Sequence, residues 1–496
     1  YIVTWALGHL VTLKDPEDYD KKYKEWNMAV LPMMPEKLQI KVIPQTGKQY
    51  HAVTTQLARK DVGEVVIATD AGREGELVAR WILDKAHNQK PCKRLWISSV
   101  TDKAIREGFA SLKDAKEYDN LYRAAVSRAE ADWLVGINAT RALTCKYNAQ
   151  LSCGRVQTPT LAMIAQREQE IREFVPKPYY TVTAAAGGAV YTWKDEKSGG
   201  TRISDPEKAK QIAEKAKRYP LVLQKVEKKK KQKEAPLLYD LTELQRDASA
   251  RFGYSAKQTL NLMQSLYETH KVLTYPRTDS RYLTKDIIPT LKERLDAVSI
   301  GPYKTLAQQA KRRPLKEKPG FVNDAKVSDH HAIIPTEQYV QLSALSNEER
   351  RIYDLVVRRF LAVLLPPCVY EETVIQASIE KECFTARGKR MVEKGWQEAY
   401  EDNRYDDEDE AKEEVREQNL PLLQAGMKFD QSKISLREGK TKPPARFTEG
   451  TLLSAMENPV RYMENRDSSL VKTIGEAGGL GTVATRADII EKLFRS

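Results

Sequence analysis

Hydrophobic and polar positions change their spacing several times along the chain. Residues 63–69 form a short apolar, β-branched run that predicts a buried strand. Residues 72–86 carry Leu77, Ile82 and Leu83 on one helical face. Residues 96–99 predict another strand. A strand, a turn, a helix and a strand in this order predict an α/β domain with a largely parallel sheet at the start of the chain.

The later segments alternate between helical and strand-like patterns. Their spacing predicts helices over most of 101–175, strands over 179–226 with a helix at 206–217, helices over 337–365 and strands over 366–395. Two amphipathic helices are expected after residue 240, with Thr242 and Ser255 as N-caps.

Two charged segments interrupt these patterns. The basic run at 227–236, EKKKKQKEAP, predicts a solvated connector, with a DNA-binding tail as the alternative. The acidic run at 401–416, EDNRYDDEDEAKEEVR, predicts an exposed and mobile loop.

Composition limits the class of protein. The chain has 496 residues, a length that predicts three or four domains. Its formal net charge of +12 favours a polyanionic partner, nucleic acid first. Five scattered cysteines without a CxxC pair argue against a zinc ribbon or a disulfide framework and favour a cytoplasmic location. No run approaches the ~18 apolar residues of a membrane span, so no membrane partner is expected.

The stretch TDAGREGE, at residues 69–76, places acids where a strand leads into a helix. Asp70 stands at the carboxyl end of the predicted strand, and Glu74 lies in the first turn of the helix. Carboxylates converging at this edge would suit Mg²⁺, which prefers hard oxygen ligands. An ordinary strand-to-helix turn with Asp70 as the N-cap explains the same spacing equally well.

Three further stretches combine polar chemistry with turn residues. In SCGRVQTPTLAMI, at 152–164, a Gly-Arg pair precedes an apolar helix whose first N–H groups favour an anion; a capped helix is the simpler interpretation. In SDHHAIIPT, at 328–336, one histidine could donate a proton or contact phosphate, although a loop histidine explains it as well. In LTYPRTDSRYL, at 273–283, Arg277 follows Tyr275 closely enough to hold a phosphodiester oxygen during attack by the phenol; a polar turn is the alternative.

The joint order of these stretches resembles the type IA DNA topoisomerases, and most closely the bacterial topoisomerase III branch. The matching pieces cover residues 65–493 and read TDAGREGE, SRAEADWLVGINATR, SCGRVQTPTL, FGYSAKQTL, LTYPRTDSRYL, SDHHAIIPT, PPARFTEGTLLSAME and GTVATRADIIEKL. The resemblance implies a toroid that combines α/β and mainly helical domains. Its domains would be a Toprim domain at 1–100, a helical base with the DNA groove at 101–170 and 417–496, a β-rich arch at 171–235 and 337–416, and a helical tyrosine domain at 236–336.

The resemblance also implies an activity. Tyr275 would attack a DNA phosphate to form a 5′-phosphotyrosyl link, a strand would pass through the gap, and the break would be resealed without ATP. The chain indeed lacks a GxxxxGK[ST] loop. Such an enzyme relaxes negative supercoils and decatenates DNA. Its substrate would be single-stranded or underwound DNA, and its cofactor would be Mg²⁺. The enzyme would be a monomer in the bacterial cytoplasm, associated with the nucleoid or with a plasmid. Its partner would be a helicase or a single-strand-binding protein.

Roles carry over to individual positions in the same way. Arg277 would stabilise charge on the phosphate, His330 would contact or protonate near it, and Asp70 and Glu74 would hold the metal, Glu74 also serving in catalysis. The single strand would lie along Ser152, Cys153, Gly154, Arg155, Val156 and Gln157. Arg141, Trp26 and Trp133 would add further DNA contacts, and Thr485 and Arg486 would lie near the same groove.

Two departures from the family pattern bear on activity. Gly72 stands where many members carry a second aspartate. The first Toprim strand, with its glutamate and lysine, is expected to precede Tyr1, so we expect the chain to be a piece of a longer protein. A single-stranded-DNA-binding fragment without full activity is therefore the alternative function. A Toprim nuclease or primase fits less well, since it leaves Tyr275 and Arg277 without a role.

Overall fold

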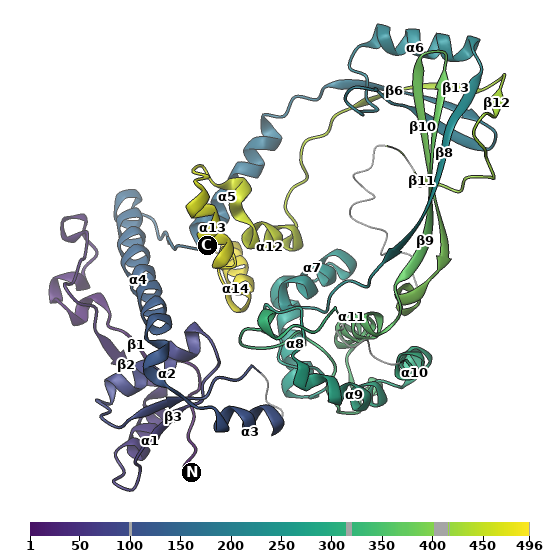
Figure 1. Cartoon of the computed structure of the whole chain (residues 1–496). Helices are drawn as coiled ribbons and strands as arrows, with labels where there is room; N and C mark the ends of the chain where they lie inside the picture. Colours follow the sequence, from purple (N-terminus) through teal and green to yellow (C-terminus); the bar gives the residue numbers. More distant parts are fainter. Residues whose placement is uncertain (99–101, 314–319, 401–414, 416, 496) are drawn as a thin grey trace.

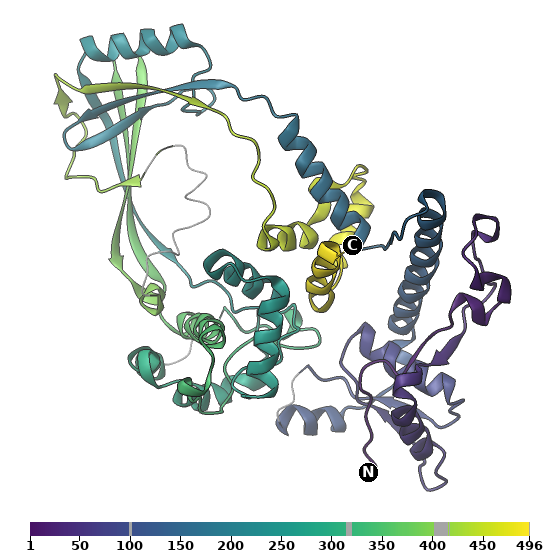
Figure 2. The same ribbon diagram turned by 180° about the vertical axis from the view of Figure 1, so that it is seen from behind.

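The computed structural model describes residues 1–98, 102–313, 320–400, 415 and 417–495, and these residues form a ring (Figures 1 and 2). The N-terminal segment and the C-terminal helices lie at one side of the ring, and a long sheet arches over it. A group of helices between residues 241 and 364 completes the ring below the sheet. In the described parts of the chain, no helix has the length and apolar character needed to cross a bilayer.

The first hundred residues form a small α/β unit. The parallel pair β3–β4 is continued by an antiparallel β5, so the predicted parallel sheet is small and only partly parallel. The expected strand at 96–99 is wrong for residues 96–98, because the pairing ends at Arg94; residue 99 lies outside the described residues. The elements are β1 (Val11–Leu13), β2 (Ile40–Val42), α1 (Gly47–Leu57), β3 (Val65–Ile67), α2 (Arg73–Lys85) and β4 (Cys92–Arg94).

The segment from 102 to 175 is mainly helical, as its hydrophobic spacing predicts. A long helix and a second helix leading to the arch carry most of the residues between 101 and 175. The elements are α3 (Asp102–Ala110), β5 (Lys113–Asp114), α4 (Asp119–Tyr147) and α5 (Gln157–Arg172).

The arch is an eight-stranded sheet with order β12-β8-β9-β10-β7-β6-β13, in which β11 pairs with β10. The basic run does not form a connector: β8 extends through Lys233 and pairs with β9 along that length. Lys231 meets Glu372 on β9, so cross-strand charge pairing stabilises a lysine-rich strand. The elements are β6 (Pro178–Ala186), β7 (Ala189–Trp193), α6 (Pro206–Arg218), β8 (Leu221–Lys233), β9 (Cys368–Ile379), β10 (Glu382–Glu393), β11 (Glu417–Gln418), β12 (Lys428–Phe429) and β13 (Lys433–Lys440). The expected acidic loop at 401–416 lies outside the described residues, residue 415 excepted.

The helices around the loop that carries Tyr275 enclose the largest apolar cluster of the described residues. This cluster includes Leu273, Ile334 and Phe360. Ser255 caps α8 as predicted, but Asp240 rather than Thr242 caps α7, accepting a hydrogen bond from the N–H of Glu243. The elements are α7 (Leu241–Phe252), α8 (Ala256–Glu268), α9 (Leu291–Ala297), α10 (Lys304–Lys311) and α11 (Asn347–Leu364).

The C-terminal helices close the ring against these helices. Apolar side chains of both groups share one buried cluster, in which Leu241 and Leu260 meet Leu453 and Ile490. The elements are α12 (Glu449–Glu457), α13 (Ser468–Glu476) and α14 (Val483–Arg495).

Candidate active site and nucleic-acid interface

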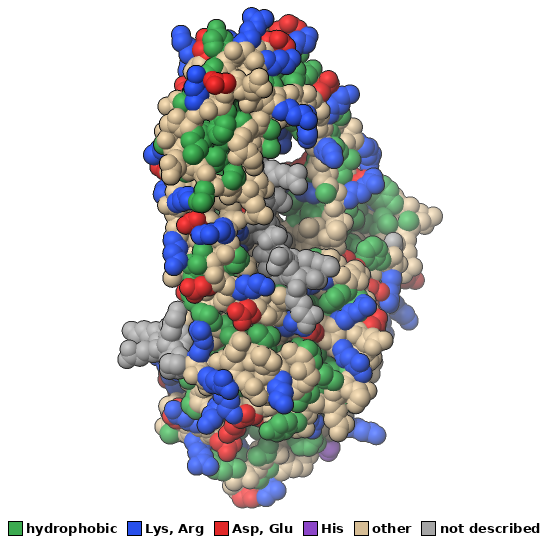
Figure 3. Space-filling view, turned by 90° about the vertical axis from the view of Figure 1, so that its right-hand side faces the viewer, with side chains coloured by type: hydrophobic (Ala, Val, Ile, Leu, Met, Phe, Trp, Pro, Cys, Tyr) green, Lys and Arg blue, Asp and Glu red, His purple; other side chains and the backbone are tan. Residues whose placement is uncertain are grey.

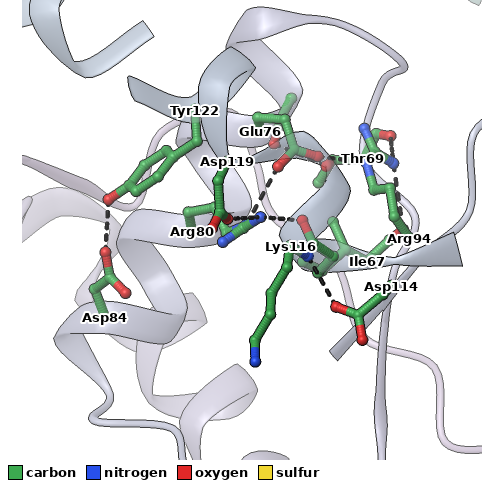
Figure 4. Close-up of polar contacts among 12 residues, drawn as sticks. Ile67, Thr69, Glu76, Arg80, Asp84, Arg94, Asp114, Lys116, Asp119 and Tyr122 are labelled. Carbon is green, nitrogen blue, oxygen red and sulfur yellow. Dashed lines mark hydrogen bonds and ion pairs between the residues drawn. The ribbon is translucent and has the colours of Figure 1, made fainter. Parts of the chain in front are cut away.

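A buried ion pair fixes the turn that carries the first acids. Nε of Arg94 on β4 lies 2.5 Å from Oε1 of Glu76 on α2, and both side chains are fully buried. The same guanidinium donates hydrogen bonds to the carbonyls of Thr69 and Asp70. Figure 4 shows Arg94 near Thr69 and Glu76. Arg80 joins Glu76 to Asp119 on α4. The buried Arg94–Glu76 pair therefore fixes the turn between β3 and α2. An aspartate N-cap does not, because Gly72 occupies the N-cap position.

The turn faces the segment that carries the histidines and the tyrosine. Nε2 of His330 lies 3.8 Å from Oδ2 of Asp70. The ring of His330 lies against that of Tyr275, with ring centroids 4.3 Å apart. Residues separated by about two hundred positions in the chain therefore form one group of acid, imidazole and phenol.

This group lines a cavity of about 1040 Å³ between the two domains, which we call the interdomain cavity. Its walls include Asp70 and Ser98 from the first domain and Tyr275, Asp329 and His330 from the helical domain. The sequence did not point to Tyr267, Glu268, Lys271 or Asp102, which also line it. Their positions in predicted helices and turns carried no distinguishing signal.

The electrostatics keep the phenol of Tyr275 protonated near neutral pH. Burial raises the pKa of Tyr275, and the positive charge of Arg277 opposes that rise. Arg277 itself is exposed and lies two residues after Tyr275, so it can approach an anion bound at the phenol. His331 is different from its neighbour: burial lowers its pKa to about 4, and its Nδ1 donates to the carbonyl of Ala332. Of the two histidines, His330 is the one that lies beside both Tyr275 and Asp70.

Glu74 belongs to a separate arrangement. Its carboxylate meets Arg128 on α4 at 3.2 Å and His9 at 3.3 Å. The hydrogen bond from His9, more than the charge of Arg128, lowers the pKa of Glu74, and His330 has the same effect on Asp70. Both carboxylates are more than half exposed and offer hard oxygens, so their chemistry suits Mg²⁺. Within the described ranges, however, no three His, Cys, Asp or Glu side chains converge closely enough to hold a metal ion.

A further carboxylate occupies the space beside Gly72. A Cβ atom on residue 72 would lie 2.4 Å from each carboxylate oxygen of Asp329. Burial, together with the charges of Asp279 and Asp70, raises the pKa of Asp329 to about 6. The second acid that Gly72 lacks is thus replaced in space by one from another domain, which sequence spacing could not show.

The SCGRVQ segment forms the link between α4 and α5. Nη1 of Arg155 lies 2.9 Å from Oδ1 of Asp132 on α4, and both side chains are close to half exposed. The backbone of Cys153 is held by Thr140, and its Sγ accepts a hydrogen bond from Thr158, which also bonds the N–H of Gly154. Ser152 accepts from the side chain of Gln157, and Val156 packs against the apolar cluster of the C-terminal helices. Within residues 152–157, the exposed polar side chains are Ser152 and Arg155.

The three side chains predicted to add DNA contacts lie in different environments. Arg141 is buried, donates to the carbonyl of Tyr23 and stacks over the ring of Trp26, which is half exposed. Trp133 donates to the carbonyl of Lys14 and packs against the apolar cluster of the first domain. Trp26 is therefore the one of the three that presents an open face to solvent.

Arg486 lies at the interface between the C-terminal helices and α7. It is buried, pairs with Glu457 at 3.2 Å and donates to Oγ1 of Thr242. Oγ1 of Thr485 accepts a hydrogen bond from the N–H of Thr482, at the start of α14. Over the face drawn in Figure 3, lysine and arginine are scattered rather than gathered into one patch. Net charge alone thus does not locate a nucleic-acid path.

Comparison with known proteins identifies the family. Residues 116–496 match the DNA topoisomerase family, and residues 1–100 match the Toprim domain. The chain belongs to the type IA DNA topoisomerases.

Relatives agree with this assignment. The chain is 59% identical to DNA topoisomerase 3 of Bacillus subtilis (strain 168) and 58% identical to that of Bacillus licheniformis. Both matches cover all of this chain and 68% of the relative. A solved structure of full-length topoisomerase I from Thermotoga maritima matches 99% of this chain and 74% of its own, with a TM-score of 0.66 and 22% identity. The likeness to that structure confirms the toroidal fold, and the relatives confirm the topoisomerase III resemblance.

Proposed function

We propose that Tyr275 is the nucleophile of this type IA topoisomerase, with Asp70 and His330 as its partners. The observation that supports this most directly is the interdomain cavity, which brings a phenol, an imidazole and a carboxylate together from two domains. In cleavage, Oη of Tyr275 bonds to a backbone phosphorus while the bond from phosphorus to the 3′ oxygen breaks. The phenol releases its proton to the surrounding water, and the 3′ oxygen gains a proton from His330. Resealing reverses each change, so no ATP is consumed.

Each side chain has a distinct task in this scheme. Arg277 holds the non-bridging oxygens, where negative charge develops. His330, whose Nε2 lies 3.8 Å from Oδ2 of Asp70, gives the proton to the leaving 3′ oxygen and takes it back in resealing. Because Tyr275 is protonated at rest, loss of its proton has to coincide with substrate binding.

Asp70 and Glu74 are the residues of the turn that would hold Mg²⁺. When bound, the ion would neutralise phosphate charge beside the tyrosine. Glu74 would exchange its contacts with His9 and Arg128 for this role, so its proposed catalytic part lies in the metal site rather than in proton transfer.

The DNA strand reaches the cavity along the link between α4 and α5. We assign phosphate contacts to Ser152, Arg155 and Arg277, and base stacking to Trp26, which is exposed. Cys153, Gly154, Val156 and Gln157 shape the same link. Trp133 and Arg141 contribute by supporting the wall of the first domain rather than by direct contact.

Strand passage requires the ring to open. We assign residues 1–100 to Toprim, 101–170 with 417–496 to the base, 171–235 with 337–416 to the arch, and 236–336 to the tyrosine domain. The interdomain cavity lies between the first and last of these, so it opens when the tyrosine domain swings away. The enzyme relaxes negative supercoils and decatenates DNA in the bacterial cytoplasm as a monomer, with a helicase or single-strand-binding protein exposing its substrate.

A labelled oligonucleotide tests the proposal. The protein is incubated with single-stranded DNA labelled at its 5′ or 3′ end and with Mg²⁺, and the reaction is stopped with detergent. A covalent adduct that retains the 3′ label and disappears in Tyr275→Phe is expected. Binding without adduct would instead support the DNA-binding alternative. Cleavage that persists in Tyr275→Phe would support a Toprim nuclease.

A further inference from the structure

The glycine at position 72 is explained by space rather than by backbone conformation. Its φ of −160° and ψ of 179° are extended values that any residue adopts. The space that a side chain would need is occupied by the carboxylate of Asp329, 2.4 Å from the Cβ position. A side chain at residue 72 and the carboxylate of Asp329 therefore exclude each other in this arrangement.

Charges of both signs surround the carboxylate of Asp329 beside Gly72. Gly72 is the N-cap of α2, a helix of 13 residues, and has no side chain to cap the first N–H groups. Partial positive charge at a helix N-terminus favours a carboxylate there, and Arg73 adds a full positive charge nearby. The negative charges of Asp70 and Asp279 oppose it. Asp329 is thus held where attraction from the helix end and repulsion from its acidic neighbours act together.

Asp329 also precedes His330 in the chain. With Asp329 against Gly72, Nε2 of His330 lies 3.8 Å from Oδ2 of Asp70, and its ring lies 4.3 Å from the ring of Tyr275. We propose that Gly72 and Asp329 form a matched docking pair between the Toprim and tyrosine domains, and that Asp329 is a positioning residue that aligns His330 in the closed ring. This inference rests on the proposed function for the role of His330, but not for the docking itself.

A double-mutant cycle separates docking from chemistry. Gly72→Ala, Asp329→Ala and the double variant are compared for the rate of covalent adduct formation with saturating Mg²⁺. Each single variant is expected to lower the rate at least ~10-fold. The double variant is expected to match the singles rather than multiply them, because both changes abolish one contact. Asp329→Asn, which keeps the shape but not the charge, is expected to retain more activity than Asp329→Ala.

A second readout reports docking without the reaction. In a Tyr275→Phe background, fluorescent dyes are placed through unnatural amino acids at His51 on α1 and Lys304 on α10, both exposed. Gly72→Ala is expected to lower the energy transfer between them, because the tyrosine domain spends less time closed. Gly63→Ala is the matched control, since a methyl group at Gly63 meets nothing within 4 Å.

Two results would overturn the docking pair. One is a double variant whose loss equals the product of the two single losses. The other is energy transfer that Gly72→Ala leaves at the level of Gly63→Ala. Should Tyr275→Phe still form the adduct, the proposed nucleophile would fail, but the energy-transfer result would still decide whether the pair exists.

Discussion

The ring of His330 lies 4.3 Å from the ring of Tyr275, centroid to centroid, with the two planes tilted by 42°. One residue follows α8 and the other lies in a loop more than fifty positions later. The contact places an ionisable imidazole beside the phenol, while Oδ2 of Asp70 from the Toprim turn lies 3.8 Å from its Nε2. The expected chemistry of this enzyme depends on these three side chains.

Loss of the imidazole should slow covalent adduct formation more than it weakens DNA binding. His330→Gln keeps a polar side chain but cannot carry a proton, and a positioned proton donor contributes ~10²–10⁴-fold. We expect a rate reduced by about 100-fold, measured in single-turnover reactions with labelled oligonucleotide. His51→Gln, at an exposed site on α1, should react like the parent protein. An unchanged rate in His330→Gln would exclude His330 from proton transfer.

Breaking the buried ion pair should destabilise the Toprim domain. Arg94→Leu leaves the buried Glu76 with Arg80 as its remaining partner, and loss of one partner of a buried pair costs roughly 3–5 kcal/mol. It also frees the carbonyls of Thr69 and Asp70, so adduct formation should fall in parallel. Urea unfolding provides the measurement. The exposed pair of Arg59 and Asp61 gives the comparison: Arg59→Leu should leave the free energy of unfolding nearly unchanged. Equal losses at the two sites would contradict the role assigned to Arg94.

Stability should respond to pH through Asp240. Burial raises its pKa to about 7, above the model-peptide value of ~3.9. Between these values the unfolded chain releases a proton that the folded chain keeps, so stability falls as pH rises from about 4 to 7 and then levels off. Asn at the same position can still cap α7. Asp240→Asn should therefore match the parent most closely near pH 4 and be more stable than the parent at pH 8, on the order of 4 kcal/mol by the same linkage. A difference between the two proteins that does not grow from pH 5 to pH 8 would refute the assignment.

The link between α4 and α5 should contribute to DNA affinity through charge. Arg155→Ala removes a cation that is half exposed and paired with Asp132. Affinity for single-stranded DNA should fall, and the slope of log affinity against log salt should become shallower by about 0.7, the value for one phosphate contact. Fluorescence anisotropy at several salt concentrations measures both quantities. Asp132→Asn, which frees Arg155, should keep the parent slope. If Arg155→Ala changes affinity without changing the slope, the contact is not with phosphate.

The local structure was largely predictable. Alternation and helical spacing identified α2, α6 and the two amphipathic helices, because a face that packs against a core must repeat with the period of its element. The order of LTYPRTDSRYL, SDHHAIIPT and TDAGREGE likewise indicated the family before any coordinates. Errors arose where pairing across the sheet overrode local composition. The lysine-rich run at 227–233 forms a strand because the acidic side chains of β9 lie opposite it.

Contacts between domains were decided only by the tertiary structure. Nothing in the spacing of the chain shows that Asp329 fills the space beside Gly72, that Glu74 turns toward Arg128 and His9, or that Arg141 is buried against Trp26. Sequence determines which side chains are available and which face of an element they occupy, since both depend on neighbours a few residues away. Which carboxylate meets which imidazole depends on how whole domains close on one another, and that distance is set by packing far from the residues that react.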